Sequence, residues 1–366
     1  METPLPGATI RVAILKSPSF SLKGMDLIVK DSAGRPVPLP DAYDEIKVSV
    51  SKDRSHILLG SREVEGEPLT IESPGVYFRI AGRQYREKVS VYREGEKLLA
   101  VNAIELEDYL VGLINHEISS AWPIEAVEAQ AVVARTYALY QAGNSRDPRY
   151  DLESTVEDQV YGGSQVEDYA SAKAVRETAG QVLVDDEGAP VQAFYCSSCG
   201  GITELPQNVW GMATPLKKSV KDPWCEGSPG ATWTLSVGAE ELGAKLAAAG
   251  YPGGTVSSIS VLKRSAADRA VAIRIEASDG ETKIGGNELR RVIGYDKLKS
   301  ARFTVKKSGE SFLFQGRGNG HGVGLCQWGA RGMATAGYSY RQILGFYYPG
   351  LYLRSMDKIQ LRQASR

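Results

Sequence analysis

The chain has 366 residues, of which 42% are hydrophobic and 24% are charged, a composition typical of folded globular proteins that excludes extensive disorder. Its 43 Lys and Arg residues nearly balance 44 Asp and Glu residues, so no overall charge attracts nucleic acid or an anionic membrane surface. Only His56, His116 and His321 are histidines, which excludes a metal centre built from several imidazoles. The length fits roughly two or three domains.

The first hundred residues predict β structure. Short runs rich in β-branched residues are separated by Gly, Pro and Ser clusters, which is the pattern of strands joined by turns. The expected strands are 9–15, 26–30, 45–51, 56–60 and 68–72. The alternating segment 88–93, a turn at Gly95 and the segment 98–104 predict a β-hairpin.

Helices are predicted where the pattern changes at Glu105. Residues 105–118 carry leucines at helical spacing and acidic residues in the first turn. Pro123 is suited to open the next helix, 123–142, which is alanine-rich and ends before Gly143-Asn144. A third helix is expected over 165–179.

The remainder alternates between strands and helices. Residues 182–185 and 191–195 predict a second hairpin, with strands at 256–263, 270–275 and 312–315 and helices at 239–249, 286–293 and 339–347. The expected fold class is α+β, with a β-rich N-terminal region followed by helices packed on antiparallel sheet, and it is not lysozyme-like. No run of about 18 apolar residues occurs, so no membrane span is expected.

Glu117 is the first candidate for chemistry. It ends the 105–118 helix beside a loop that holds Trp122, and a carboxyl desolvated by an indole is suited to general acid catalysis. The alternative is an ordinary solvated glutamate at a helix end. Gln130 and Arg135 stand on the otherwise small and apolar surface of the 123–142 helix. Arg135 therefore needs an anionic or carbonyl partner, and a structural salt bridge is the alternative to an active-site role.

A glycine-dense segment at 316–324 is the second candidate. Such a loop favours positive φ angles or close approach to a ligand, and it lacks the GK[ST] ending of a phosphate loop. His321 within it, followed by Gln327, supplies hydrogen-bonding groups. A purely structural histidine is the alternative.

The four cysteines form the third candidate. Cys196 and Cys199 make a CxxC pair, with Cys225 and Cys326 farther along the chain. Short ligand pairs of this kind favour tetrahedral zinc. Disulfides, or four buried thiols, are the alternatives.

Six collinear blocks resemble the SpoIID/LytB family of bacterial sporulation and cell-wall proteins. They run from about residue 85 to 352 and read VNAIELEDYL (101–110), EISSAWPIEAVEAQAVVARTYA (117–138), DQVYG (158–162), CGGIT (199–203), GNGHGVG (318–324) and ILGFYYPG (343–350). The resemblance implies a lytic transglycosylase acting on peptidoglycan glycan strands, with Glu117 as the single acid/base and Arg135 as its active-site partner. Peptide-stripped strands are the expected substrate.

The resemblance also implies supporting roles. Gln130, Gln159 and His321 would position sugar groups, Gln327 would add hydrogen-bonding capacity, and Trp122, Tyr137 and Tyr161 would offer stacking faces. Glu125 and Glu128 are rival carboxylates, which we interpret as dipole partners and exposed face of the long helix.

Relatives commonly carry His at the position of Cys196 and Ser at that of Cys326, and some bind zinc in this region. A structural Zn²⁺ held by Cys196, Cys199, Cys225 and Cys326 is therefore expected, with disulfides as the alternative. No cofactor is required for catalysis itself.

Three further expectations follow. The chain divides into a β-rich accessory region (1–84), a SpoIID-like catalytic domain (85–352) and a C-terminal tail (353–366). The protein acts outside the cytoplasm, in the cell envelope or the forespore–mother-cell space, with its export or anchor segment absent from this sequence. The alternative function is a non-catalytic glycan-binding protein that stimulates a cell-wall amidase as its partner.

Overall fold

The computed structural model describes residues 7–39, 45–75, 77–155 and 158–359. The chain divides into two compact units, one formed by Met1–Val182 with Arg354–Arg366 and the other by Leu183–Leu353. Residues 360–366 of the expected C-terminal tail lie outside the described residues. Helices and strands are mixed in both units and most strand pairs are antiparallel, which confirms the predicted α+β class.

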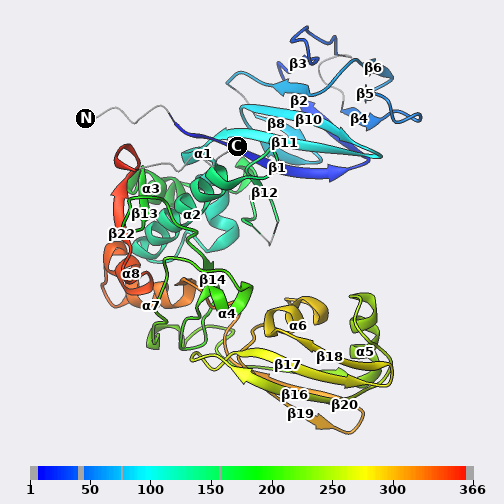
Figure 1. Ribbon diagram of the computed structural model, residues 1–366. Coiled ribbons are helices and arrows are strands. Elements are labelled where there is room, and N and C mark those ends of the chain that lie inside the picture. The colour runs from blue at the N-terminus through cyan, green and yellow to red at the C-terminus, as the bar shows by residue number, and fades with distance from the viewer. Residues whose placement is uncertain (1–6, 40–44, 76, 156–157, 360–366) are drawn as a thin grey trace. The chain divides into compact units, whose positions relative to one another are not determined.

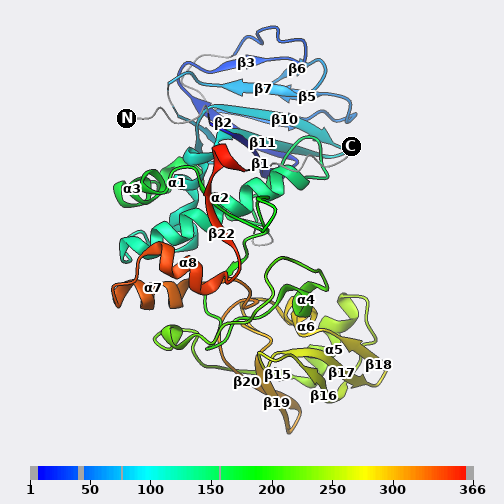
Figure 2. The same cartoon turned by 60° about the vertical axis from the view of Figure 1, so that its left-hand side comes forward.

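Strands dominate the first part of the first unit. They are β1 (Thr9–Ser17), β2 (Ser19–Gly24), β3 (Ile28–Lys30), β4 (Ile46–Val50), β5 (Ile57–Leu59), β6 (Arg62–Val64), β7 (Leu69–Glu72), β8 (Phe78–Ile80), β9 (Arg83–Tyr85), β10 (Lys88–Glu94) and β11 (Lys97–Glu105). Two short strands come later, β12 (Leu152–Glu153) and β13 (Gln181–Val184), and β13 spans the boundary at residue 182 between the two units. One sheet has the order β12-β1-β11-β10-β7-β3, and most of its strands follow one another in Figure 2. The other has the order β6-β5-β4-β2-β8-β9.

The predicted hairpin around Gly95 is confirmed, because β10 and β11 pair antiparallel from Lys88↔Ala103 to Glu94↔Lys97. Strands β1, β3 and β7 precede residue 84, whereas β10 and β11 follow it, and all five share one sheet. The functional division at residue 84 stays a prediction.

Three helices pack beside the first sheet. They are α1 (Leu106–Glu117), α2 (Ile124–Asn144) and α3 (Tyr169–Glu177), preceded by the 3₁₀ turn η1 (Ser164–Val166). Helices α1 and α2 both contact β1, and they lie together in Figure 1. The third helix starts later than predicted because Asp168 caps it, accepting from the Ser171 N–H at 2.7 Å.

The second unit contains two small antiparallel sheets, β15-β20-β19 and β16-β17-β18. Its elements are β14 (Tyr195–Cys196), α4 (Pro206–Trp210), η2 (Pro223–Cys225), β15 (Trp233–Gly238), α5 (Ala239–Ala248), β16 (Val256–Arg264), β17 (Ala270–Ala277), β18 (Gly280–Ile284), α6 (Gly286–Ile293), β19 (Phe303–Ser308), β20 (Ser311–Gly316), β21 (Leu325–Cys326), α7 (Gln327–Thr335) and α8 (Tyr340–Tyr347). The chain closes with β22 (Tyr352–Ser355) and η3 (Met356–Lys358). Phe303, Phe312 and Phe314 belong to the core that α5 and α6 cover (Figure 1).

One predicted element is wrong. The second arm of the 182–195 hairpin forms only an isolated bridge between Val184 and Pro190, and Tyr195–Cys196 pairs instead with Leu325–Cys326 in parallel. The glycine-dense segment delivers β21 to this position, and a long-range pairing of this kind has no local sequence signal.

Candidate functional site

Glu117 ends helix α1 and is partly buried. One oxygen of its carboxyl, Oε1, lies 3.4 Å from the backbone N–H of Val160, which donates to it. Tyr109 stands two helical turns earlier on α1 and is fully buried. Burial, followed by the negative charge of Glu117, raises the pKa of the Tyr109 phenol well above its ordinary value. Glu117 is thus partly shielded from water, and it lies near a phenol that keeps its proton.

The segment that follows residue 157 connects other predicted site residues with the surroundings of Glu117. Gln159 accepts a hydrogen bond from the Tyr109 hydroxyl at 3.1 Å through its Oε1. Asp158 accepts one from the Tyr137 hydroxyl at 2.9 Å. The structure therefore brings Glu117, Tyr137 and Gln159 together through the short segment that packs against α1 and α2.

Three of the predicted substrate-binding residues have no face open to a ligand. Gln130 and Tyr161 are 0% exposed and Gln159 is 1% exposed. The ring of Tyr161 lies 5.1 Å from that of Tyr109, and its hydroxyl donates to Asn102 Oδ1 at 3.3 Å. Tyr161 therefore has no ring face open to a sugar in this structure, so the geometry gives no support to the stacking predicted for it. Trp122 is partly exposed in the turn between α1 and α2.

Arg135 is completely buried, and its guanidinium forms a two-pronged ion pair with Glu107. The Nε–Oε1 and Nη2–Oε2 distances are 2.8 Å and 2.7 Å. The same guanidinium donates to the carbonyls of Val175 and Gln181 at 3.2 Å and 3.1 Å. The expected anionic and carbonyl partners are thus confirmed. The predicted catalytic role of Arg135 stays a prediction.

Glu128 does not lie on an exposed face of α2, as the sequence suggested, because its side chain is only 6% exposed. It approaches Glu125 on the same helix and Glu177 on α3. Burial first, and then a hydrogen bond with Glu177 and the charge of Glu125, raises the pKa of Glu128 to about 8. At neutral pH this carboxyl is therefore mostly protonated.

The glycine-dense segment adopts the backbone its composition predicts. Gly318, Gly320, Gly322 and Gly324 all have positive φ, between 72° and 109°. Such φ angles are strained for side chains other than glycine, so these glycines are needed where the segment lies against residues 194–200.

His321 projects from this segment as a neutral base. Its Nδ1 accepts the backbone N–H of Val323 at 3.0 Å, and its ring lies 4.9 Å from that of Trp210. Burial lowers the pKa of His321 to about 3, so it carries no charge at neutral pH. Gln327 is buried at the start of α7. Both residues belong to the Leu183–Leu353 unit, whereas Glu117 belongs to the other.

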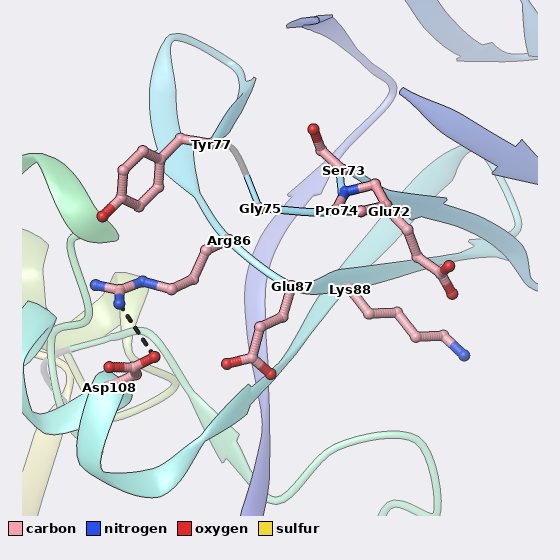
Figure 3. A pocket seen from close by; sticks show the side chains of 9 residues that line it. All are labelled: Glu72, Ser73, Pro74, Gly75, Tyr77, Arg86, Glu87, Lys88 and Asp108. Atoms are coloured by element: carbon pink, nitrogen blue, oxygen red, sulfur yellow. Dashed lines mark ion pairs between the residues drawn. The ribbon is translucent and has the colours of Figure 1, made fainter. Parts of the chain in front are cut away.

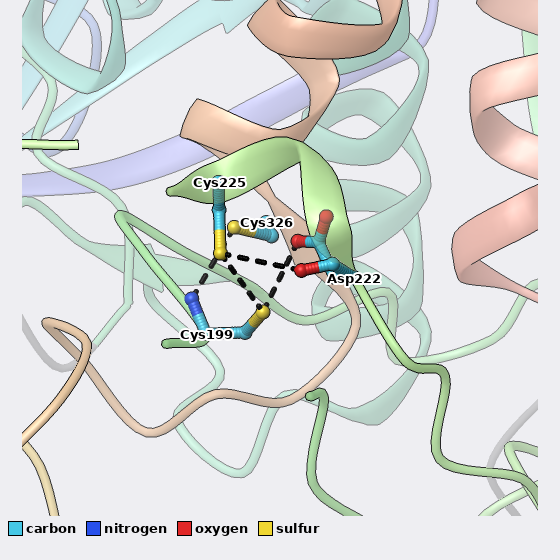
Figure 4. Close-up of side chains that lie close together, drawn as sticks. All are labelled: Cys199, Asp222, Cys225 and Cys326. Carbon is cyan, nitrogen blue, oxygen red and sulfur yellow. Dashed lines mark hydrogen bonds between the residues drawn. The ribbon is translucent and has the colours of Figure 1, made fainter. Parts of the chain in front are cut away.

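A buried cluster of thiols and one carboxylate forms the candidate metal site (Figure 4). One donor atom each from Cys199, Asp222, Cys225 and Cys326 lies within 4.8 Å of the others. The Cys199 thiol donates to Asp222 Oδ2 at 3.1 Å, and the sulfurs of Cys199 and Cys225 are 3.7 Å apart. A disulfide needs about 2.05 Å between its sulfurs, so these thiols are free, as is that of Cys196.

Cys196, the fourth predicted ligand, lies outside this cluster. Its side chain meets the segment near Gly320, where a Cβ would lie 2.9 Å from that of Cys196. Asp222 takes the fourth position instead. It caps η2 by accepting the Trp224 N–H at 2.9 Å, and it stands three residues before Cys225. The spacing of Asp222 and Cys225 is a sequence signal that an analysis of the cysteines alone does not include.

Three thiols and a carboxylate fit a tetrahedral zinc ion. Hydrogen bonds from Cys199 and Cys326 hold the pKa of Cys225 well below its usual range, which favours the thiolate that binds metal. Burial raises the pKa of Asp222, because a carboxylate away from water is costly unless a cation compensates its charge. The donor set therefore matches the predicted Zn²⁺ in chemistry, although not in every residue.

A cavity of about 570 Å³ opens at the other end of α1 from Glu117 (Figure 3). Tyr77, Arg86, Glu87 and Asp108 are among the residues that line it, and the Arg86 guanidinium pairs with Asp108 at 3.0 Å. None of the predicted site residues lines this cavity. The sequence held no motif that marked it.

Within the described residues, no helix has the length and apolar character needed to cross a membrane. This agrees with the absence of a long apolar run in the sequence.

Two regions of the chain match models of known protein families. Residues 94–184 match the family model described as Stage II sporulation protein (SpoIID), and this stretch includes Glu117, Arg135 and Gln159. Residues 231–324 match a model described as a domain of unknown function, which includes His321.

Three curated relatives resemble most of the chain. Stage II sporulation protein D of Bacillus amyloliquefaciens is 33% identical over 81% of this chain and 84% of its own. An uncharacterized protein of Brachyspira hyodysenteriae is 32% identical over 77% of this chain and 75% of its own. The amidase enhancer of Bacillus subtilis is 32% identical over 67% of this chain, which spans 40% of that longer protein.

Proposed function

This chain belongs to the SpoIID/LytB family, and from that premise we propose that it is a lytic transglycosylase that cleaves peptidoglycan glycan strands. The observation that carries the proposal is the position of Glu117. It lies in the family-matched region, partly buried, with one carboxyl oxygen held by the Val160 N–H. The substrate is the bond between N-acetylmuramic acid and N-acetylglucosamine, in strands stripped of peptides, outside the cytoplasm.

One carboxyl is sufficient for this reaction. Glu117 donates its proton to the glycosidic oxygen as the bond to the muramic acid C1 breaks, which leaves an oxocarbenium-like centre. The 6-hydroxyl of the same sugar attacks C1 and returns its proton to Glu117. The product is a 1,6-anhydro sugar, no water is consumed, and Glu117 ends protonated as it began.

The neighbouring residues act by holding Glu117 in place. Val160 and Gln159 belong to one short segment, and Gln159 is fixed by the buried Tyr109 of α1. We assign Trp122 the exposed apolar face beside the scissile bond. Arg135 contributes by fixing α1 through Glu107.

We also propose that Cys199, Asp222, Cys225 and Cys326 hold a structural Zn²⁺. These four residues would hold the ion as a structural cross-link between η2, β21 and the CxxC segment, and it would supply no chemistry to the reaction.

Incubation with purified peptidoglycan and with amidase-treated strands tests the activity, with 1,6-anhydromuramic ends detected by mass spectrometry. Glu117→Gln is expected to lower the rate by about 10²–10⁴-fold, the usual contribution of a general acid. Glu125→Gln, which removes a rival carboxyl on α2, is the matched control and retains activity. Reducing ends in place of anhydro ends would show that water attacks, and would contradict the mechanism.

A non-catalytic, amidase-stimulating glycan binder is the second candidate, because one relative is named amidase enhancer. It predicts that the native protein cleaves neither substrate, still binds strands, and accelerates an added cell-wall amidase equally well with Glu117→Gln.

A further inference from the structure

Two buried arginines line a small enclosed cavity in the Leu183–Leu353 unit. Arg269 directly precedes β17 and is 2% exposed, and Arg290 lies on α6 and is 5% exposed. Both line a cavity of about 10 Å³ together with Glu204, Asn208, Asn287 and His321. Helix α6 packs on β17 (Figure 1), and the two arginines line the same cavity.

The guanidinium of Arg269 has hydrogen-bond donors without acceptors. Its Nη2 donates to the Cys199 carbonyl at 2.6 Å, but Nε and Nη1 are buried and have no hydrogen-bond partner among the residues that the structure describes. Gly322 makes this position possible, because a Cβ there would lie 2.1 Å from Nη2. A buried charged donor left unpaired is costly, so these atoms indicate an acceptor in the cavity.

The charges around the cavity do not balance. Within the described residues, neither Arg269 nor Arg290 forms an ion pair with a carboxylate. Glu204 is the one acidic residue in the lining, and its oxygens already accept from Leu205, Asn208 and Ser265. His321 is neutral, because burial lowers its pKa to about 3. Among the residues that line the cavity, two positive charges and one negative charge leave an excess of one.

The arginines also act on each other. Arg290 donates to the Leu298 carbonyl at 3.0 Å and to Asn287 Oδ1 at 3.1 Å, and both of these acceptors are neutral. Burial, and to a smaller degree the positive charge of Arg269, lowers the pKa of Arg290 to about 10. Two guanidiniums that repel each other away from water are stabilised by an anion between them.

We propose that this cavity binds one small monovalent anion, of the size and charge of chloride. The cavity has room for about one water-sized particle, which excludes phosphate, sulfate and carboxylates. A single negative charge neutralises the excess and supplies the acceptor that Arg269 lacks. The site lies within the region that matches a domain of unknown function, apart from Glu204 and Asn208, and it does not depend on the transglycosylase activity.

Bromide tests the site directly, because it replaces chloride and scatters anomalously. Crystals of the full chain soaked in sodium bromide are expected to show an anomalous peak between Arg269 and Arg290. In solution, chloride at ten times its dissociation constant is expected to raise the Tm of this unit by about 4 °C relative to gluconate at equal ionic strength.

Arg290→Met removes the excess charge and is expected to abolish the chloride-dependent shift of Tm. Arg291→Met, on the exposed side of the same helix, is the matched control and keeps the shift. A cavity that contains only water in the bromide-soaked crystals would overturn the proposal, and so would equal stabilisation by chloride and gluconate. The bromide experiment uses the unaltered protein, so it remains decisive if Arg290→Met fails to fold.

Discussion

At the scale of single residues, the contacts of Arg135 are structural ones within the first unit. Its guanidinium is fully buried and is satisfied by Glu107 and by backbone carbonyls. Glu107 lies in the first turn of α1, and Glu117 ends the same helix. Arg135 is therefore a positioning residue in our proposal, since it anchors the helix that presents the acid.

Replacement of Glu107 by Gln tests this role. The change leaves a buried guanidinium without its anion, and we expect the free energy of unfolding to fall by about 2–3 kcal/mol, discounted because Glu107 is partly exposed. Urea denaturation measures the loss. Arg135→Lys is expected to lose most of the same stability, because an ammonium cannot reproduce the two-pronged pair.

An unchanged stability of Glu107→Gln would contradict this role of Arg135. If Glu107→Gln unfolds at the same urea concentration as the native chain, the ion pair is not structural. Arg135 would then have to be considered a residue that contacts substrate.

At the scale of secondary-structure elements, the contact of α2 with α3 brings three acidic side chains together and buries one of them, Glu128. Glu128 and Glu125 on α2 meet Glu177 on α3, and Lys173 pairs with Glu177 at 3.9 Å. Like charges this close cannot all ionise without cost. A carboxyl at this contact between the helices therefore keeps its proton, and Glu128 is the one whose pKa is raised.

This contact makes stability depend on pH. The pKa of Glu128 rises from 4.5 to about 8 on folding, so the folded chain holds this proton more tightly than the unfolded chain. Its stabilising contribution is complete below pH 4.5 and is lost as the pH rises toward 8. We expect the free energy of unfolding to decrease over that window, and Glu128→Gln to remove that part of the decrease.

Urea denaturation at pH 5 and at pH 8 measures the difference. Glu240→Gln, at an exposed site in the first turn of α5, is the control and should leave the pH dependence unchanged. An identical decrease in the native chain and in Glu128→Gln would show that the carboxyl is not buried in solution.

At the scale of the whole molecule, the proposed zinc site belongs to one of the two compact units. Cys199, Asp222, Cys225 and Cys326 all lie within Leu183–Leu353. Elements far apart in sequence, η2 and β21, meet at these donors. A metal at this point would stabilise that unit because binding and folding are coupled there.

We expect one zinc per chain by elemental analysis. Asp222→Asn is expected to lose most of it, whereas Cys196→Ser, which removes a thiol outside the cluster, should retain it. Chelation is expected to lower hydrogen-exchange protection at 199–225 and 325–335 by on the order of tenfold or more, with α2 unaffected. Metal lost equally from both variants would restore Cys196 as a ligand.

Local structure and family membership were predictable from the amino-acid sequence alone. Helices α1 and α2 were predictable because leucine spacing, alanine content and Pro123 act within one or two turns. The positive φ angles at 318–324 were predictable because only glycine adopts them without strain. The collinear motifs were sufficient to identify the family, since they depend on order along the chain.

Which groups meet depends on the tertiary structure. It pairs Arg135 with Glu107, buries Glu128 near α3 and gathers Asp222 with three of the cysteines. Among the described residues, it gives Arg269 and Arg290 no carboxylate in an ion pair. Each of these outcomes depends on contacts between segments distant in the chain. Side-chain charge and burial are set by those contacts, and neither periodicity nor residue spacing records them.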